Sequence, residues 1–287
     1  MSDAPAFNPE RFKAATREAW EHAAPGWNAQ APRIRPWLAE ATEALLDEAQ
    51  VRPGAQVLDL AAGAGEQTLD IARRIGPQGS VLATDISPAI LALAAQNCQR
   101  AGLNQVETLA VDAEALDAGE AVFDAAICRL GLMFCPDPLQ ALQRVHRALK
   151  PGARLATLVF GEPAHNPCIT ILMSTALRHA GQPPRDPYTP GTLLSLGRPG
   201  LLDELFRQAG FGNVATTVLA APFRLPSARD YLDFVRSSAT PILQILAPLD
   251  DAARQAAWAE IEDKLNAFRT PDGWVGPNEL LLTVGQR

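Results

Sequence analysis

The sequence lacks several features that define common functional classes. Its 25 Lys and Arg stand against 32 Asp and Glu, giving a formal net charge of −7, and the basic residues form no run. A surface of that sign repels a phosphate backbone, so we expect no nucleic-acid partner. No apolar run is long enough for a membrane span, and the N-terminal MSDAPAFNPERFK has no signal-peptide core, which predicts a cytoplasmic protein.

Cysteine is also scarce. The four cysteines show no C-x-x-C pair and no spacing typical of zinc ligands: Cys98, Cys128, Cys135 and Cys168. We therefore predict free thiols and no metal site.

Short apolar runs alternate with helical patterns in the first half of the chain. Strands are predicted at 56–61, 80–86, 106–112, 123–130 and 153–160, and later at 213–223 and 279–284. Strands that alternate with helices predict an α/β fold with a parallel sheet and right-handed crossovers. A helical insertion separates the last two strands.

The order of these patterns divides the chain into a core and its covers, all within one structural domain. We predict an N-terminal helical lid at 1–50, a nucleotide-binding core at 51–160, a cap insertion at 161–200, a core helix and strand at 201–224, a helical cap insertion at 225–275 and a last core strand at 276–287. The lid begins with a helix that Asn8 caps and Pro9 opens.

The segment VLDLAAGAGEQT, residues 57–68, is the most informative motif. It is predicted to be a buried strand that ends in an acid, then a glycine-rich turn, then a helix start. Gly63 and Gly65 leave room for a ligand near the backbone, and the helix directs its amide N–H groups there. Asp85, twenty residues after Gly65, is placed to accept hydrogen bonds from ribose hydroxyls.

Asp59, Asp85 and Asp112 each end a successive predicted strand. In an open parallel sheet the three strand ends border one crevice. Glu114 and Asp117 follow the third strand and are predicted to be loop or capping residues.

Five consecutive segments then carry a family resemblance: VLDLAAGAGEQT, ATDIS, VDAEAL, FDAAICRLGLMFCPDP and LKPGARL. On these segments the chain resembles class I S-adenosylmethionine-dependent methyltransferases, in particular the quinone-biosynthesis C-methyltransferase branch (methyltransferase types 11 and 25). The resemblance implies a Rossmann-like, doubly wound sheet of seven strands, with one antiparallel strand near the C-terminus. It also implies S-adenosylmethionine as cofactor and S-adenosylhomocysteine as product.

The resemblance implies roles for individual residues. Asp59 and the turn from Ala61 to Gly65 would hold the methionine part, Asp85 the ribose, and Asp112 the adenine amino group. The full predicted cofactor set is Asp59, Ala61, Gly63, Gly65, Thr68, Asp85, Ile86, Ser87, Asp112, Ala113, Arg129 and Leu130. Family members often carry a small polar residue where Arg129 stands, so we expect Arg129 to pair with an acid or a substrate anion.

Methyl transfer is an in-line displacement that needs alignment and exclusion of water, and a general base helps if the acceptor is a hydroxyl or enol. His165 and His22 are the candidate bases. Trp20 and Trp27 are candidate lid residues over the sulfonium, since aromatic faces stabilise cations. Tyr188 is a candidate lid residue that shapes an apolar substrate pocket. For all five residues, ordinary packing or an exposed loop position is the competing interpretation.

Two other functions remain open. A nicotinamide oxidoreductase is disfavoured because Thr68 replaces the third glycine of G-x-G-x-x-G, and neither Tyr188 nor Tyr231 has a Lys four residues later. The same fold can also bind S-adenosylmethionine for other chemistry or for regulation. We predict a methyltransferase, monomeric or homodimeric, that acts on a small, hydrophobic or aromatic molecule in biosynthesis.

Overall fold

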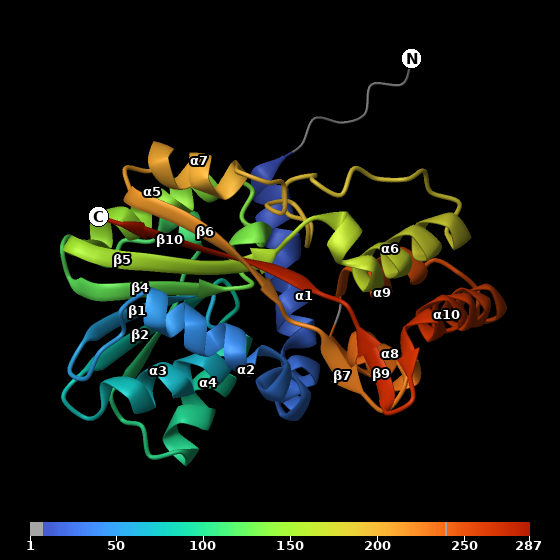
Figure 1. The fold of residues 1–287 in the computed structure, drawn as a ribbon, viewed down its shortest axis with the longest axis horizontal. Helices are drawn as coiled ribbons and strands as arrows, with labels where there is room; N and C mark the ends of the chain where they lie inside the picture. The colour runs from blue at the N-terminus through green and yellow to red at the C-terminus, as the bar shows by residue number, and fades with distance from the viewer. Residues whose placement is uncertain (1–7, 239) are drawn as a thin grey trace.

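The computed structural model describes residues 8–238 and 240–287. A seven-stranded sheet with the order β3-β2-β1-β4-β5-β10-β6 forms its centre (Figure 1). The strands are β1 (Gln56–Leu60), β2 (Ser80–Asp85), β3 (Val106–Ala110), β4 (Phe123–Arg129), β5 (Leu149–Phe160), β6 (Gly212–Ala220) and β10 (Glu279–Gln286). This arrangement confirms the predicted Rossmann-like sheet.

Strand β10 is the single antiparallel member of this sheet. It pairs antiparallel with both β5 and β6, whereas β1 pairs parallel with β2 and β4. Asp59 lies opposite Ala83 of β2 and Ile127 of β4, in the middle of the sheet. The carboxyl ends of β1, β2 and β4 therefore meet along one edge, which faces the cap in Figure 1.

Helices cover both faces of the sheet, as expected for a doubly wound fold. On one face lie α2 (Ala31–Glu48), α3 (Glu66–Ile75) and α4 (Pro88–Arg100); on the other lie α5 (Pro138–Ala148) and α7 (Leu201–Gln208). Ser87 caps α4 and Asp137 caps α5, each followed by proline in the first turn. Local sequence thus fixes where the helices start.

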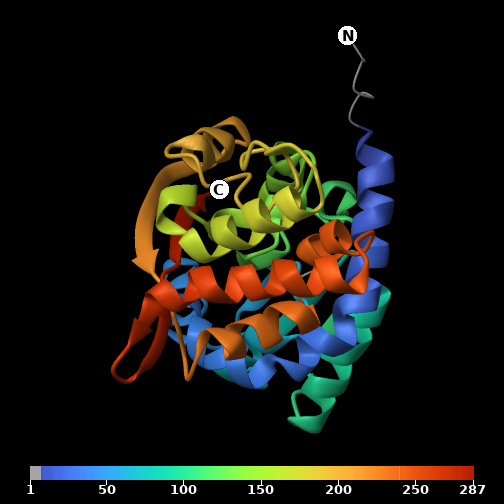
Figure 2. The same ribbon diagram turned by 90° about the vertical axis from the view of Figure 1, so that its right-hand side faces the viewer.

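The cap lies beyond the carboxyl edge of the sheet (Figure 2). It contains α6 (Pro167–His179), α8 (Ala228–Ser238), α9 (Thr240–Leu246) and α10 (Asp251–Leu265). A small antiparallel sheet joins β7 (Phe223–Leu225), β9 (Gly273–Gly276) and β8 (Arg269–Thr270). The sequence did not predict this sheet; its strands are short, and Trp274 anchors it by donating from its indole N–H to the Leu265 carbonyl at 2.7 Å.

Helix α1 (Pro9–Ala29) runs along one side of the molecule and connects its two parts (Figures 1 and 2). The Asn8 side chain accepts a hydrogen bond from the Arg11 N–H, as the cap prediction requires. The helix packs on α4 of the core and on α8 of the cap. Gly26 makes the second contact possible, since a Cβ there would lie 1.9 Å from the Ser237 carbonyl oxygen. Within the described ranges, no helix is long and apolar enough to cross a membrane.

Candidate functional site

Asp59 is the most deeply buried acid at the sheet edge. Its side chain accepts hydrogen bonds from Thr68 Oγ1 at 2.6 Å and from Gln67 Nε2 at 3.2 Å. Burial raises its pKa to about 7, although both hydrogen bonds and the nearby Arg129 oppose the shift. Asp59 therefore fastens the first turn of α3 to the end of β1.

The glycine-rich turn uses left-handed backbone at Ala61, Gly63 and Gly65. At Gly65 the reason is packing rather than a ligand, because a Cβ would lie 3.0 Å from the Ala94 side chain of α4. Gly63 has more room, with the Trp27 indole nitrogen 3.6 Å from the position of an added Cβ. Of the two predicted glycines, Gly63 thus lies at the open side of the turn and Gly65 supports it.

Asp85 links the ends of β1 and β2. It accepts hydrogen bonds from the Gly63 N–H at 3.1 Å and the Ser87 N–H at 3.0 Å. Burial raises the pKa of Asp85, while the N–H groups of Ser87, Gly63 and Ile86 favour its ionised form. Its carboxylate retains lone pairs for further donors. The Ser87 hydroxyl itself caps α4 by accepting from the Ile90 N–H.

Asp112 follows β3 and pairs with a residue that the sequence did not single out. Lys13 of α1 lies 2.8 Å from Asp112 Oδ2 and 2.6 Å from Glu114 Oε2. Burial alone would lower the pKa of Lys13. The hydrogen bonds and charges of Asp112 and Glu114 outweigh burial and raise this pKa. Ala113 begins the short helix between these acids.

Glu114 differs from its predicted role as a loop or capping residue. Its side chain is buried, pairs with Lys13 and accepts from the Asp137 N–H at 2.7 Å. It thereby joins α1, the loop after β3 and the start of α5. Asp117 is exposed, as expected for a loop residue.

Arg129 ends β4 and is buried beneath the glycine turn. Its Nη1 donates to Thr42 Oγ1 at 2.9 Å, and its Nη2 lies 3.9 Å from Glu66 Oε2. Burial lowers the pKa of Arg129, whereas the charges of Glu66 and Asp59 raise it. Glu66 is therefore the acid partner that we expected for Arg129. The next residue, Leu130, has a left-handed backbone, and its N–H donates to the Leu158 carbonyl.

Trp20 and Trp27 of α1 form the side of the lid nearest the glycine turn. Their rings meet edge to face with centroids 5.5 Å apart. Trp20 also contacts Phe134 at 5.7 Å, and Trp27 contacts Phe234 of α8 at 6.4 Å. Helix α1 therefore contacts the carboxyl edge of the sheet at two places, through Trp27 near Gly63 and through Lys13 at Asp112.

Part of the sequence matches the model of a known family. Residues 37–174 match the model of the ubiE/COQ5 methyltransferase family. The seven-stranded sheet has the Rossmann-like methyltransferase fold, and residues 37–174 are similar to the quinone-biosynthesis methyltransferases. One similar protein is the ubiquinone/menaquinone biosynthesis C-methyltransferase UbiE of Klebsiella pneumoniae, 36% identical over 123 residues, which are 42% of this chain and 49% of the relative. The chain thus spans about half the length of the curated relatives it matches.

Solved structures agree with this methyltransferase fold. The YcgJ protein of Bacillus subtilis superimposes with a TM-score of 0.58 and 17% identity, over 87% of this chain and 98% of that one. The cyclase SpnF superimposes with a TM-score of 0.52 and 20% identity, over 86% and 80% of the two chains. These likenesses cover most of the chain but concern the fold alone.

The two candidate bases lie apart in this methyltransferase fold. His165 follows β5, and its Nδ1 lies 2.9 Å from Glu279 Oε2, with 56% of its side chain exposed. His22 is exposed on α1, where its Nδ1 donates to the Glu18 carbonyl at 2.8 Å. Only His165 borders the carboxyl edge of the sheet.

The predicted lid residues are also split. Trp20 and Trp27 contact each other beside the glycine turn, whereas Tyr188 lies half-exposed in the loop after α6, near Glu162. Burial and that acid raise the pKa of Tyr188. The structure therefore does not bring Tyr188 into the Trp20–Trp27 contact.

A continuous aromatic cluster connects the crevice to the cap. Trp37 of α2 stacks on Phe223 with centroids 3.9 Å apart, and Phe223 contacts Phe234 at 5.3 Å and Tyr231 at 5.2 Å. Phe234 leads back to Trp27. These rings form one packed cluster that joins α2, β7 and α8 and reaches Trp27 beside the glycine turn.

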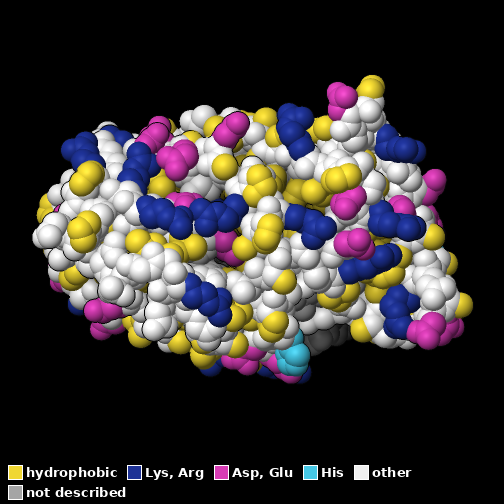
Figure 3. Space-filling model, turned by 90° about the horizontal axis from the view of Figure 1, so that it is seen from below, with side chains coloured by type: hydrophobic (Ala, Val, Ile, Leu, Met, Phe, Trp, Pro, Cys, Tyr) yellow, Lys and Arg dark blue, Asp and Glu magenta, His cyan; other side chains and the backbone are white. Residues whose placement is uncertain are grey.

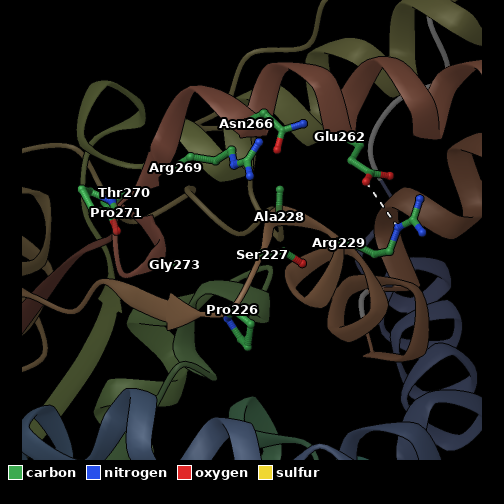
Figure 4. Close-up of a pocket in the computed structure, with 10 residues that line it drawn as sticks. All are labelled: Pro226, Ser227, Ala228, Arg229, Glu262, Asn266, Arg269, Thr270, Pro271 and Gly273. Atoms are coloured by element: carbon green, nitrogen blue, oxygen red, sulfur yellow. Dashed lines mark ion pairs between the residues drawn. The ribbon is translucent and has the colours of Figure 1, made fainter.

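An open hollow elsewhere in the cap lies apart from these residues (Figure 4). It is lined by the start of α8, the end of α10 and the turn between β8 and β9, and Arg229 is paired with Glu262 across it at 3.3 Å. None of the predicted site residues lines it. On the face shown in Figure 3, basic and acidic side chains occur together. Among the residues that the structure describes, no group of three or more His, Cys, Asp or Glu side chains is placed to hold a metal.

Sequence reasoning missed Lys13, Thr42 and Glu66. Glu66 stands in the quoted motif directly after the glycine turn, so its position was a usable signal. Lys13 and Thr42 act over long sequence distances, and nothing in their surroundings marks them.

Proposed function

We propose that this protein binds S-adenosylmethionine at the carboxyl edge of the sheet and transfers its methyl group to a small acceptor. The observation that carries the proposal is the Asp85 carboxylate, held at a strand end by the Gly63 and Ser87 N–H groups beside a glycine-rich turn. This is the geometry for binding a ribose in a doubly wound sheet. The match of the same segment to a methyltransferase family supports the cofactor.

The site residues suggest how the cofactor would lie. With the ribose on Asp85, the adenine would extend toward Asp112 and Ala113, and the methionine part toward the turn from Ala61 to Gly65. The methionine end would then face Leu130 and the Trp27 ring. In this arrangement residues 1–50 and the insertions at 161–200 and 225–275 act as the lid, and closure would exclude water from the displacement.

The aromatic cluster supports a hydrophobic acceptor. Trp37, which is partly exposed, stacks on the buried Phe223, and Phe234 contacts Trp27 beside the glycine turn. A substrate bound against this cluster would meet aromatic rings rather than charged side chains. Flat rings favour an aromatic or quinone-like molecule. The curated relatives are named for ubiquinone and menaquinone biosynthesis, which agrees with this acceptor class.

We propose His165 as the general base, because it lies at the crevice edge and Glu279 orients its ring through Nδ1. We expect His165→Ala to lower turnover without changing the affinity for S-adenosylhomocysteine. A pH–rate profile that keeps its shape in this variant would exclude His165 from proton transfer. His22 is the control, because its replacement should leave the profile unchanged.

The decisive experiment is calorimetric titration of the protein with S-adenosylhomocysteine and, in parallel, with NADH. One-site binding of the first alone supports the proposal, whereas binding of NADH alone would support an oxidoreductase. The likeness to the cyclase SpnF makes a second assay necessary, because one fold can host other chemistry. Formation of S-adenosylhomocysteine with quinone-like acceptors separates methyl transfer from such chemistry.

A further inference from the structure

Glu66 is a buried acid with one oxygen unaccounted for. It is the first residue of α3, directly after the glycine turn, and only 3% exposed. Its Oε2 is 3.9 Å from Arg129 Nη2, beyond hydrogen-bond length. Its Oε1 has no hydrogen-bond partner among the residues that the structure describes. Burial raises the pKa of Glu66, whereas the charge of Arg129 and hydrogen bonds from the Glu66 backbone N–H and the Trp27 indole favour the ionised form.

The neighbouring side chains do not explain this free oxygen. Thr42 bonds to Arg129, while Thr68 and Gln67 both bond to Asp59. A buried carboxylate oxygen without a donor destabilises the fold, because its lost hydration is not replaced by a hydrogen bond. A buried polar atom without a partner requires an explanation, and one explanation is a ligand that supplies the missing donor.

The charges of the cluster indicate which ligand would complete it. Arg129 Nη2, at 3.9 Å, is the one ion-pair partner of Glu66 among the described residues, and it approaches Oε2 rather than Oε1. The oxygens of Asp59 already accept from the protein, which leaves Glu66 Oε1 as the free acceptor. A primary ammonium group offers three donors and a positive charge, and both match this position.

We propose that Glu66 Oε1 binds the α-ammonium group of the cofactor's amino-acid part, with Thr42 and Arg129 holding the Glu66 carboxylate in place. The inference rests on the proposed function, since it deepens the assignment of the methionine end of that site. It transfers the ammonium contact from Asp59, which the sequence favoured, to Glu66. Asp59 instead supports the turn from below.

The test compares two ligands that differ in the amino-acid part. S-Adenosylhomocysteine contains the ammonium group, whereas 5′-methylthioadenosine has the same adenosine portion without it. We expect Glu66→Gln to weaken binding of S-adenosylhomocysteine about tenfold or more and to change binding of 5′-methylthioadenosine less than twofold. Asp85→Ala is the matched control, because it should weaken both ligands.

The outcomes separate the two proposals. If the unaltered protein binds neither ligand, the proposed function fails. If Glu66→Gln weakens the binding of both ligands equally, or of neither, the proposed ammonium contact is wrong, whereas the proposed cofactor site is not contradicted. A second measurement does not depend on the variant folding: the unaltered protein should bind a deaminated analogue of S-adenosylhomocysteine about tenfold more weakly than the parent. Equal binding would also overturn the contact.

Discussion

Asp59 should make the stability of this protein depend on pH in a direction opposite to that of most acids. Its carboxyl is fully buried at the end of β1, and its pKa rises from 3.8 to about 7. The folded protein therefore holds this proton up to neutral pH, whereas the unfolded chain releases it near pH 4. Between pH 4 and pH 7, unfolding therefore releases this proton, and the free energy of unfolding falls as the pH rises through that range.

The size of the effect follows from the shift. Each pKa unit corresponds to about 1.4 kcal/mol, so between pH 5 and pH 8 the Asp59 carboxyl should lose roughly 3 kcal/mol of its stabilising contribution. Asp59→Asn removes the titration and keeps the shape of the side chain. The free energy of unfolding of the variant, relative to that of the unaltered protein, should therefore rise by about 3 kcal/mol from pH 5 to pH 8.

Urea unfolding at intervals from pH 5 to pH 8 measures the difference directly. Asp124→Asn is the control. Burial alone would raise the pKa of Asp124, but the Gln56 N–H and Lys150 lower it, so Asp124 is ionised above pH 5 in both the folded and the unfolded protein. Its stability difference should stay constant over the range. If the Asp59→Asn difference is equally constant, the buried proton does not exist and the reasoning is refuted.

Three further results are expected. Asp85→Ala should weaken the binding of S-adenosylhomocysteine, measured by calorimetry, more than tenfold, because two ribose hydroxyls lose their acceptor; unchanged affinity would refute the ribose assignment. Lys13→Met should increase hydrogen exchange along α1, because Asp112 and Glu114 lose their partner; unaltered exchange would show that the ion pairs do not hold the helix. Gly65→Ala should lower stability by about 1–3 kcal/mol, since its Cβ would press on α4 in a left-handed conformation; an unchanged urea midpoint would contradict this.

Short sequence signals were sufficient to predict most of the fold. Asn8, Ser87 and Asp137, each followed by proline, start the helices α1, α4 and α5 as the sequence indicates. Alternation of apolar runs with helices was sufficient to predict the sheet. The small sheet of the cap was missed because β7, β8 and β9 have two to four residues each, too few for a period to show.

The candidate site residues were predictable where they stand in the glycine turn or at the end of a strand. Asp85 and Asp59 stand at strand ends, where the pattern placed them. Lys13 approaches Asp112 from almost a hundred residues away, and its position depends on how α1 packs on α4. Glu66 shows the opposite limit: its place in the motif was visible, but its free oxygen becomes apparent only when every neighbouring donor has been assigned.

Helix α1 gives these separate contacts one physical consequence. Lys13 holds the helix to Asp112 at the predicted adenine end, and Trp27 lies over the glycine turn at the methionine end. A cofactor bound between these points would lie under the helix, so the helix must move for it to enter or leave. A ligand that binds the closed form shifts the equilibrium toward that form by its differential affinity. Protection of α1 from hydrogen exchange should therefore rise with cofactor concentration and saturate at the occupancy that calorimetry measures.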